Sequence, residues 1–402
     1  MTNPPFGFAL PGGAGGPDPN DPAQLQAFLA QLQQVLANPG TGPVNWDLAR
    51  QVAQSQLRED PAVATPQSTA VEEALRLADL WLEAQSALPS GIRAIESWRR
   101  ADWLTHTLPV WRKLCDPVAF QMTNAMTGLV PEPMREQFGP MTAMLSSVGG
   151  AVFGGQLGSA LGSLAAEVLS AGDIGLPLGP EGTAALIPAN IAAYGEGLEI
   201  AEDQLRLYVA LREAAHQRLF GHVPWLRGHL LTAVETYARG ITVDRDAVEE
   251  AMGRVNPGDP ESMRELSIEG IFNSDDSPQQ TAALGRLETA LALVEGWVCH
   301  VVDRASVDRL PDAARLAETF RRRRAAGGPA EQTFAAIVGL ELRPRRLREA
   351  AALWSALSEH RGVQGRDGLW GHPDLLPSDE DFADPDGFAR RTDTDGLDEI
   401  PF

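Results

Sequence analysis

The sequence predicts a mainly α-helical protein with one minor β element. Apolar residues recur at helical spacing along most of the 402-residue chain, and the helix-favouring residues Ala, Leu, Glu and Arg come in runs. The first half shows no convincing strand alternation and no fixed-period repeat. A chain of this length forms one large domain or two ordinary ones, and the even helical pattern favours a single domain.

The amphipathic pattern divides the chain into three parts. Residues 1–22 are rich in Gly, Pro, Asn and Asp and are predicted to be disordered, residues 23–361 form a single helical domain, and residues 362–402 form an acidic, largely extended or disordered tail in which "LWGHPDLL" can dock. Between breaks at Pro and Gly, helices are predicted over residues 23–36, 44–57, 67–86, 89–105, 108–127, 201–220, 224–239, 278–304, 330–339 and 344–360. The β content is expected in "AALIPANI" and "GLEI", just before the helix at 201–220.

Charge and cysteine content exclude several classes of protein. The net charge of −21 argues against a nucleic-acid partner and against docking on anionic lipid, since both need a basic surface. Two cysteines, Cys115 and Cys299, do not support a disulfide framework. The N-terminal residues lack a basic segment followed by an apolar one, so we expect no secretory signal and a cytoplasmic location.

One uncharged stretch, residues 137–166, is long enough to be considered as a membrane span. Its glycines recur every four residues, at Gly150, Gly154, Gly158 and Gly162, which in a membrane would form a helix-pairing face. Gly, Ser and Gln dilute its hydropathy, and no basic cluster flanks it. We therefore favour a buried pair of helices in close backbone contact, and membrane association is not expected.

The stretch "REAAH" at residues 212–216 resembles the zinc-peptidase motif H-E-x-x-H with its first histidine replaced. Positions 212 and 216 lie on one face of a helix, where His216 could be a metal ligand and Glu213 the general base. A third ligand could come from Glu295, which borders the apolar stripe of the helix at 278–304. A carboxylate that faces a core needs a cation, a metal or hydrogen bonds.

Together with this motif, several stretches resemble the actinobacterial zincin-like metallopeptidase type 2 family, also called DUF2342. They are "LPLGPEGTAALIPANI", "LYVALREAAHQRLFGHVPWLRGHL", "LALVEGWVCHVVDRA", "IVGLELRPRRLREAAALW" and "LWGHPDLLP", and together they span about residues 130–380, most of the part of the chain expected to be ordered. The resemblance implies a helical zincin-like fold, a Zn²⁺ cofactor and a hydrolase or protease activity. It assigns Glu213 as the base and His216 and Glu295 as ligands. Arg212 departs from the family pattern, and so does Trp297, which stands where relatives carry histidine.

Arg212 decides how the site is interpreted, because a guanidinium stays protonated and cannot bind a metal. His216 and Glu295 alone would hold zinc weakly. Either the site has been rebuilt with another ligand, or Arg212 replaces the charge of the metal and pairs with Glu295 and also with Glu213. The candidate replacement ligands are His222, His300 and Cys299.

Three function classes follow from the sequence. The first is a zinc-dependent hydrolase with a degenerate site. The second is a non-catalytic relative that binds a peptide or protein partner through the former active-site cleft. The third is an interaction or membrane-associated protein built on residues 137–166. The basic run "FRRRRAAGG" at 320–328 could bind an acidic peptide or nucleic acid, but it is typical of a solvated helix end, which we favour.

Overall fold

The computed structural model describes residues 42–57, 60–128, 139–239, 278–325 and 346–391. It is mainly helical, as predicted, with a small two-stranded sheet. The predicted helices at 23–36 and 330–339 and the N-terminal segment 1–22 lie outside these residues. The division into one domain and two terminal segments stays a prediction.

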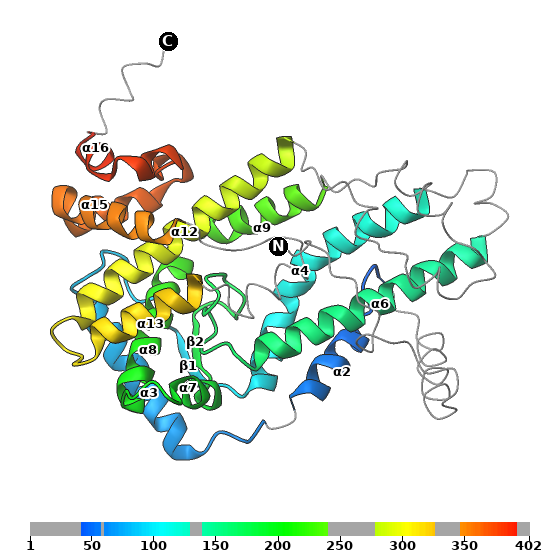
Figure 1. The fold of residues 1–402 in the computed structure, drawn as a ribbon, viewed down its shortest axis with the longest axis horizontal. Coiled ribbons are helices and arrows are strands. Elements are labelled where there is room, and N and C mark those ends of the chain that lie inside the picture. Colours follow the sequence, from blue (N-terminus) through cyan, green and yellow to red (C-terminus); the bar gives the residue numbers. More distant parts are fainter. Residues whose placement is uncertain (1–41, 58–59, 129–138, 240–277, 326–345, 392–402) are drawn as a thin grey trace, which may run out of the picture.

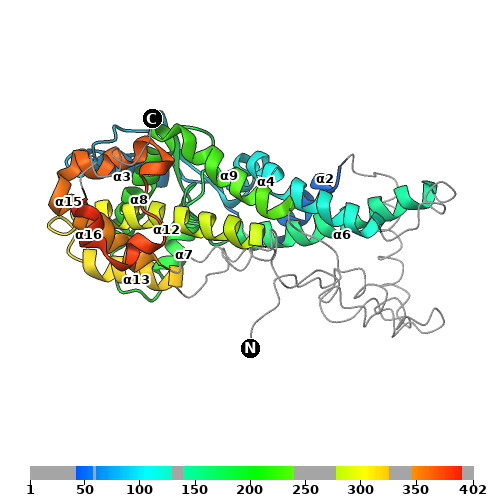
Figure 2. The same cartoon turned by 90° about the horizontal axis from the view of Figure 1, so that it is seen from above.

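The elements follow one another along the chain in this order: α2 (Trp46–Gln56), α3 (Thr65–Leu82), β1 (Ala94–Ser97), α4 (Arg100–Gly128), α6 (Gly139–Ala165), β2 (Thr183–Leu186), α7 (Pro188–Gly195), α8 (Glu202–His222), α9 (Pro224–Arg239), α12 (Pro278–Ser306), α13 (Ala313–Ala325), α15 (Leu347–Gly368), three short 3-10 helices and α16 (Pro385–Arg390). In Figures 1 and 2, α2, α4 and α6 form one end of an elongated molecule. Helices α3, α8, α12, α13 and α15 form the other end.

The helix α8 is the centre of the larger end. It packs against α3, α12, α7 and β2, and its residues from Tyr208 to Leu219 are all buried. A helix that is enclosed on all sides is a core element, so its polar residues must find partners inside the protein. This location places the "REAAH" residues in the interior.

The sheet lies beside α8 and is parallel. Strand β1 pairs with β2 in a register that sets Ala94 opposite Thr183 and Ser97 opposite Leu186. On its other edge β2 is bonded by the segment 169–171, through Ala171 N–H to Ala185 O (3.0 Å) and an antiparallel bridge from Ser170 to Leu186. The predicted minor β element near the signature helix is therefore confirmed in "AALI".

Three local predictions were wrong. Residues 94–97, expected within a helix at 89–105, form β1, because four residues are too few to show an alternation and the strand exists only by pairing with β2. The end of the helix expected at 89–105 and the helix expected at 108–127 are one helix, α4, which passes through Pro109 and Pro117. The segment "GLEI" is a turn, with Gly197 and Glu199 both at positive φ.

The acidic tail also differs from the prediction as far as residue 391. After a break at Gly362 (φ 67°), α15 resumes and short helical turns lead to α16. Buried Trp370 anchors this region: it stacks on Trp354 at 5.3 Å, and its carbonyl accepts a hydrogen bond from Trp225 Nε1 (2.9 Å). "LWGHPDLL" thus begins with a docked residue, and burial of the large aromatic ring accounts for the order around it.

The glycine repeat of α6 packs against α2 and the residues that precede it. An added Cβ at Gly158 would lie 2.3 Å from Ala49 O, and one at Gly154 would lie 2.5 Å from Asn45 O, both closer than real contacts allow. The repeat thus lets two backbones approach closely, as in the predicted buried pair. No helix among the described residues is long and apolar enough to cross a membrane.

This contact predicts a sharp difference between two neighbouring glycines. We expect Gly158→Ala to lower the free energy of unfolding by about 1–3 kcal/mol, because the new methyl group overpacks the helix interface. Gly155, on the same helix, has open space around it, so Gly155→Ala should be neutral or stabilise by about 0.5–1 kcal/mol through helix propensity. Chemical denaturation measures both. Equal effects of the two substitutions would refute the packing explanation.

Candidate functional site

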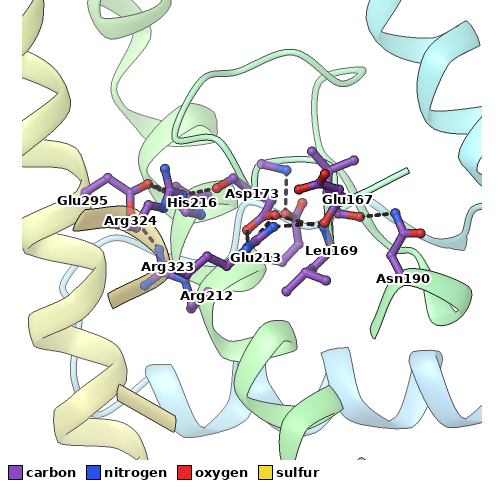
Figure 3. Close-up of polar contacts among 12 residues, drawn as sticks. Glu167, Leu169, Asp173, Asn190, Arg212, Glu213, His216, Glu295, Arg323 and Arg324 are labelled. Atoms are coloured by element: carbon purple, nitrogen blue, oxygen red, sulfur yellow. Dashed lines mark hydrogen bonds and ion pairs between the residues drawn. The ribbon is translucent and has the colours of Figure 1, made fainter. Parts of the chain in front are cut away.

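Two residues of the signature motif reach one carboxylate on a second helix (Figure 3). Arg212 Nη2 donates to Glu295 Oε2 at 2.6 Å, and His216 Nε2 donates to Glu295 Oε1 at 3.0 Å. All three side chains are buried. The one-turn spacing on α8 therefore brings the side chains of residues 212 and 216 to one point, as the motif predicts. At that point they bind a carboxylate and not a metal.

Arg212 is enclosed by groups that suit a guanidinium. Its Nη1 contacts Cys299 Sγ at 3.6 Å, and its guanidinium carbon lies 5.4 Å from the centroid of the Phe320 ring. Burial alone would lower the pKa of Arg212, but the charge of Glu295 together with the neighbouring Cys299 and Tyr208 outweighs it and holds that pKa above its ordinary value. Arg212 is therefore a permanent cation in the core.

A second arginine reaches Glu295 from α13. Arg324 Nη2 lies 3.1 Å from Glu295 Oε1 and also donates to the carbonyl of Asp173. Its neighbour Arg323 pairs with the carboxylate of Asp173 at 2.9 Å. These two residues belong to the basic run expected at a solvated helix end, and for them that interpretation was wrong, because both turn inward to buried acids. The sequence offered one indication of these contacts: a run of four arginines in a strongly acidic chain indicates that some of them pair with acidic side chains.

Glu295 consequently accepts from three donors, Arg212, Arg324 and His216. Burial would raise the pKa of Glu295, but the charges of Arg324 and Arg212 and the hydrogen bond from His216 hold it far below its ordinary value. Asp173 behaves alike: burial is outweighed by Arg323, Arg324 and the Leu169 N–H, which keep its pKa low. Two buried carboxylates and three arginines thus form one charge cluster across α8, α12, α13 and the loop at 169–178.

Glu213 bonds to the backbone of the loop and to its own helix rather than to the arginines of this cluster. Its Oε2 accepts from Gly172 N–H (2.8 Å) and its Oε1 from Gln217 Nε2 (2.9 Å). Burial raises the pKa of Glu213 despite these bonds. Among the described residues no ion pair joins Glu213 to Arg212, so the second contact that the sequence suggested for Arg212 is not formed. The Oε2 oxygen of Glu213 thus ties the loop to α8, while Oε1 bonds within the helix.

His216 has one ring nitrogen in use. Because Nε2 donates to a carboxylate, it carries a proton, while Nδ1 is buried with no hydrogen-bond partner among the described residues. Phe220 stacks on the ring at 5.8 Å. An unpaired buried nitrogen costs free energy and marks the one atom of the cluster whose hydrogen bonding is incomplete.

The other sequence candidates do not rebuild a metal site. Trp297 is buried away from the cluster and donates to Asp367 Oδ1 at 2.8 Å. His222 is exposed and bonds Ser90 O, while His300 bonds Ser358 Oγ at 2.8 Å. Burial and two nearby arginines lower the pKa of His300 to about 4. Only Cys299 touches the cluster, through Arg212.

A zinc ion therefore does not fit the residues present. Within the described part of the chain, no three His, Cys, Asp or Glu side chains are grouped so that they could hold a metal. The two candidate ligands, His216 and Glu295, bond to each other, and two guanidiniums occupy the remaining carboxylate positions. A divalent cation would lie beside two fixed positive charges and lack a third ligand.

The loop at 170–176 is shaped to touch these carboxylates. Gly175 has φ +76°, and an added Cβ there would lie 2.6 Å from Glu295 Oε1. Next to this loop, a cavity of about 20 Å³ is lined by Gly172, Gln217, Phe220 and Arg227, with room for about one water molecule. Glu213 itself is fully buried.

Comparison with known proteins identifies the family of this chain. The model of the family described as zincin-like metallopeptidase matches residues 44–389, most of the chain. The chain belongs to the zincin-like metallopeptidase family. A solved structure from Chloroflexus aurantiacus, titled a "putative hydrolase with a novel fold", is similar with a TM-score of 0.58 and 20% identity, over 86% of this chain and 97% of that one. No curated protein matches.

Gly175 gives a test of the loop contact. We expect Gly175→Ala to lower the free energy of unfolding by about 2–4 kcal/mol, from the strained backbone and from the collision with Glu295. Gly197 has nearly the same φ, +77°, but open space around it. Gly197→Ala should therefore lower the free energy of unfolding only by the cost of the strained backbone, about 1–2 kcal/mol. Thermal and urea unfolding measure the difference, and equal losses would argue against a tight contact at Glu295.

Glu295 gives a test of the electrostatics. Glu295→Gln leaves two buried guanidiniums without their carboxylate, so we expect a loss of about 3–5 kcal/mol at pH 7. Because the folded-state pKa of Glu295 is lowered, its stabilisation is complete above the ordinary value of 4.5 and is lost as the pH falls towards the folded-state pKa. Urea unfolding should therefore show the gap between wild type and variant narrowing below about pH 4.5.

A matched control for Glu295→Gln is Glu318→Gln. Glu318 pairs with Arg321 and Arg322 on the exposed face of α13. Its loss should leave the stability nearly unchanged, since exposed pairs contribute little. A constant gap for Glu295→Gln at all pH values, or an equal effect of Glu318→Gln, would contradict the proposed electrostatics.

Proposed function

We propose that this protein is a non-catalytic member of the zincin-like metallopeptidase family, with a degenerate site in which arginine replaces the charge of the metal. The observation that carries the proposal is the buried contact of 2.6 Å between Arg212 Nη2 and Glu295 Oε2. The residue that would be the first zinc ligand is thereby bonded to the residue that would be the third. Chemistry at this site that requires zinc is then absent.

The state of Glu213 supports the same proposal. A general base must come within hydrogen-bond reach of a water molecule. Each oxygen of Glu213 accepts a bond, from Gly172 and from Gln217, and the side chain has no surface exposed to solvent. Glu213 then acts as a positioning residue that fixes the loop at 169–178 against α8.

Without hydrolysis, the remaining activity of such a fold is binding. We place a peptide or protein partner at the former cleft, whose edge is the segment from residue 176 to residue 182 beside Phe220 and Arg227. This segment consists of bends and turns, and the half-buried Arg227 beside it offers a positive charge to an acidic peptide or protein surface. No nucleic-acid partner is proposed, given the net charge of −21.

A zinc-dependent hydrolase is the second candidate, because Glu213, His216 and Glu295 all occupy the positions that the family resemblance assigns to base and ligands. The similar Chloroflexus protein is titled a hydrolase as well. Metal content separates the two candidates directly.

We expect protein purified without chelator to contain less than about 0.1 zinc per chain, because two ligands hold zinc weakly. Hydrolysis of fluorescently quenched casein should not differ between wild type and Glu213→Gln, with or without EDTA. Elemental analysis and the casein assay measure these quantities. Near-stoichiometric zinc together with EDTA-sensitive hydrolysis that is lost in Glu213→Gln would overturn the proposal in favour of the hydrolase.

A further inference from the structure

Two arginines from two different helices converge on the same carboxylate. Arg212 of α8 holds Oε2 of Glu295, and Arg324 of α13 holds Oε1 (Figure 3). Their combined charge is +2, the charge of a zinc ion. Both side chains are at least nine-tenths buried, with 4% and 9% of the residue exposed. The positive charge that balances Glu295 therefore comes from two arginines. The sequence motif contains only one of them, Arg212.

The two remaining ligand candidates already have the spacing of metal ligands. With zinc–ligand distances of about 2.0–2.1 Å and tetrahedral angles, two ligand atoms lie about 3.3 Å apart. His216 Nε2 and Glu295 Oε1 are 3.0 Å apart. Position 212 is one helical turn before His216 and lies against the other oxygen of Glu295. A histidine there would complete the set of three ligands.

We infer that Arg212 and Arg324 together stand in for a divalent cation, and that the cluster is a dormant zinc site which accepts metal only when both are replaced. This inference rests on the proposed function. Replacing Arg212 alone supplies the missing ligand but leaves Arg324 bonded to the carboxylate oxygen that His216 also contacts. A zinc ion would then compete for that oxygen next to a fixed positive charge.

The test compares Arg212→His, Arg324→Gln and the double variant by titration with Co²⁺ and by competition with Zn²⁺. Cobalt reports a tetrahedral site by its visible absorption, independently of any activity. We expect the double variant to bind one Co²⁺ per chain about 100-fold more tightly than either single variant. Wild type should show no such absorption.

The matched control replaces the neighbouring arginine. Arg323 lies in the same run on α13 and pairs with Asp173, which is not a ligand candidate here. Arg212→His combined with Arg323→Gln should bind Co²⁺ no more tightly than Arg212→His alone. Adding Glu295→Gln to the double variant should abolish the tetrahedral spectrum.

The stability of the double variant provides a second readout. Losing two cations beside Glu295 should lower the melting temperature, and saturating Zn²⁺ should raise it again, since a ligand that binds the folded state stabilises it. If the variant folds only when refolded with metal, as measured by circular dichroism, the inference is supported.

Two results would overturn the inference. One is that Arg212→His alone binds Co²⁺ as tightly as the double variant, which would show that Arg324 does not block the site. The other is that the double variant, refolded with metal, either does not fold or folds without binding it. These outcomes are distinct from a failure of the proposed function, which would appear as zinc in the wild-type protein.

Discussion

The structure depends on one buried negative charge, the carboxylate of Glu295. A lone carboxylate in a protein interior is costly, so the elements around it must supply positive charge and hydrogen bonds. Arg212 of α8, Arg324 of α13 and His216 do this, and the Gly175 loop closes against the same oxygens. Four segments far apart in the sequence are thereby fixed around a single group.

Within a zincin-like fold, the proposed replacement of the metal by arginine would keep the helices docked around Glu295. A zinc ion and two guanidiniums satisfy the same carboxylate, but with different consequences. A metal leaves coordination positions open for water and substrate. A guanidinium has donors only and fills the space with its own atoms. The helices stay docked in both cases, while the position where chemistry would occur is filled.

The sequence predicted which residues face the site because helical periodicity is local: Arg212 and His216 share one face of α8, and Glu295 lies at the edge of an apolar stripe on α12. Their pairing was a hypothesis that rested on the need of a buried carboxylate for a positive partner, and the contact of 2.6 Å agrees with it. Arg324 could not be predicted, since neighbouring arginines at a helix end look alike and only tertiary packing turns two of them inward. Strand β1 and the ordered tail escaped prediction for a related reason: pairing with β2 and burial of Trp370 are long-range contacts.

An arginine is part of the polypeptide, so every copy of the chain is synthesised with both the guanidinium groups and the Glu295 carboxylate that they neutralise. A metalloprotein instead competes for zinc with every other zinc-binding protein in the cell, and its folded fraction follows the free-zinc concentration. If Arg212 and Arg324 replace the metal as proposed, the charge of Glu295 is balanced within the chain itself, and assembly of the core would not depend on the free-zinc concentration.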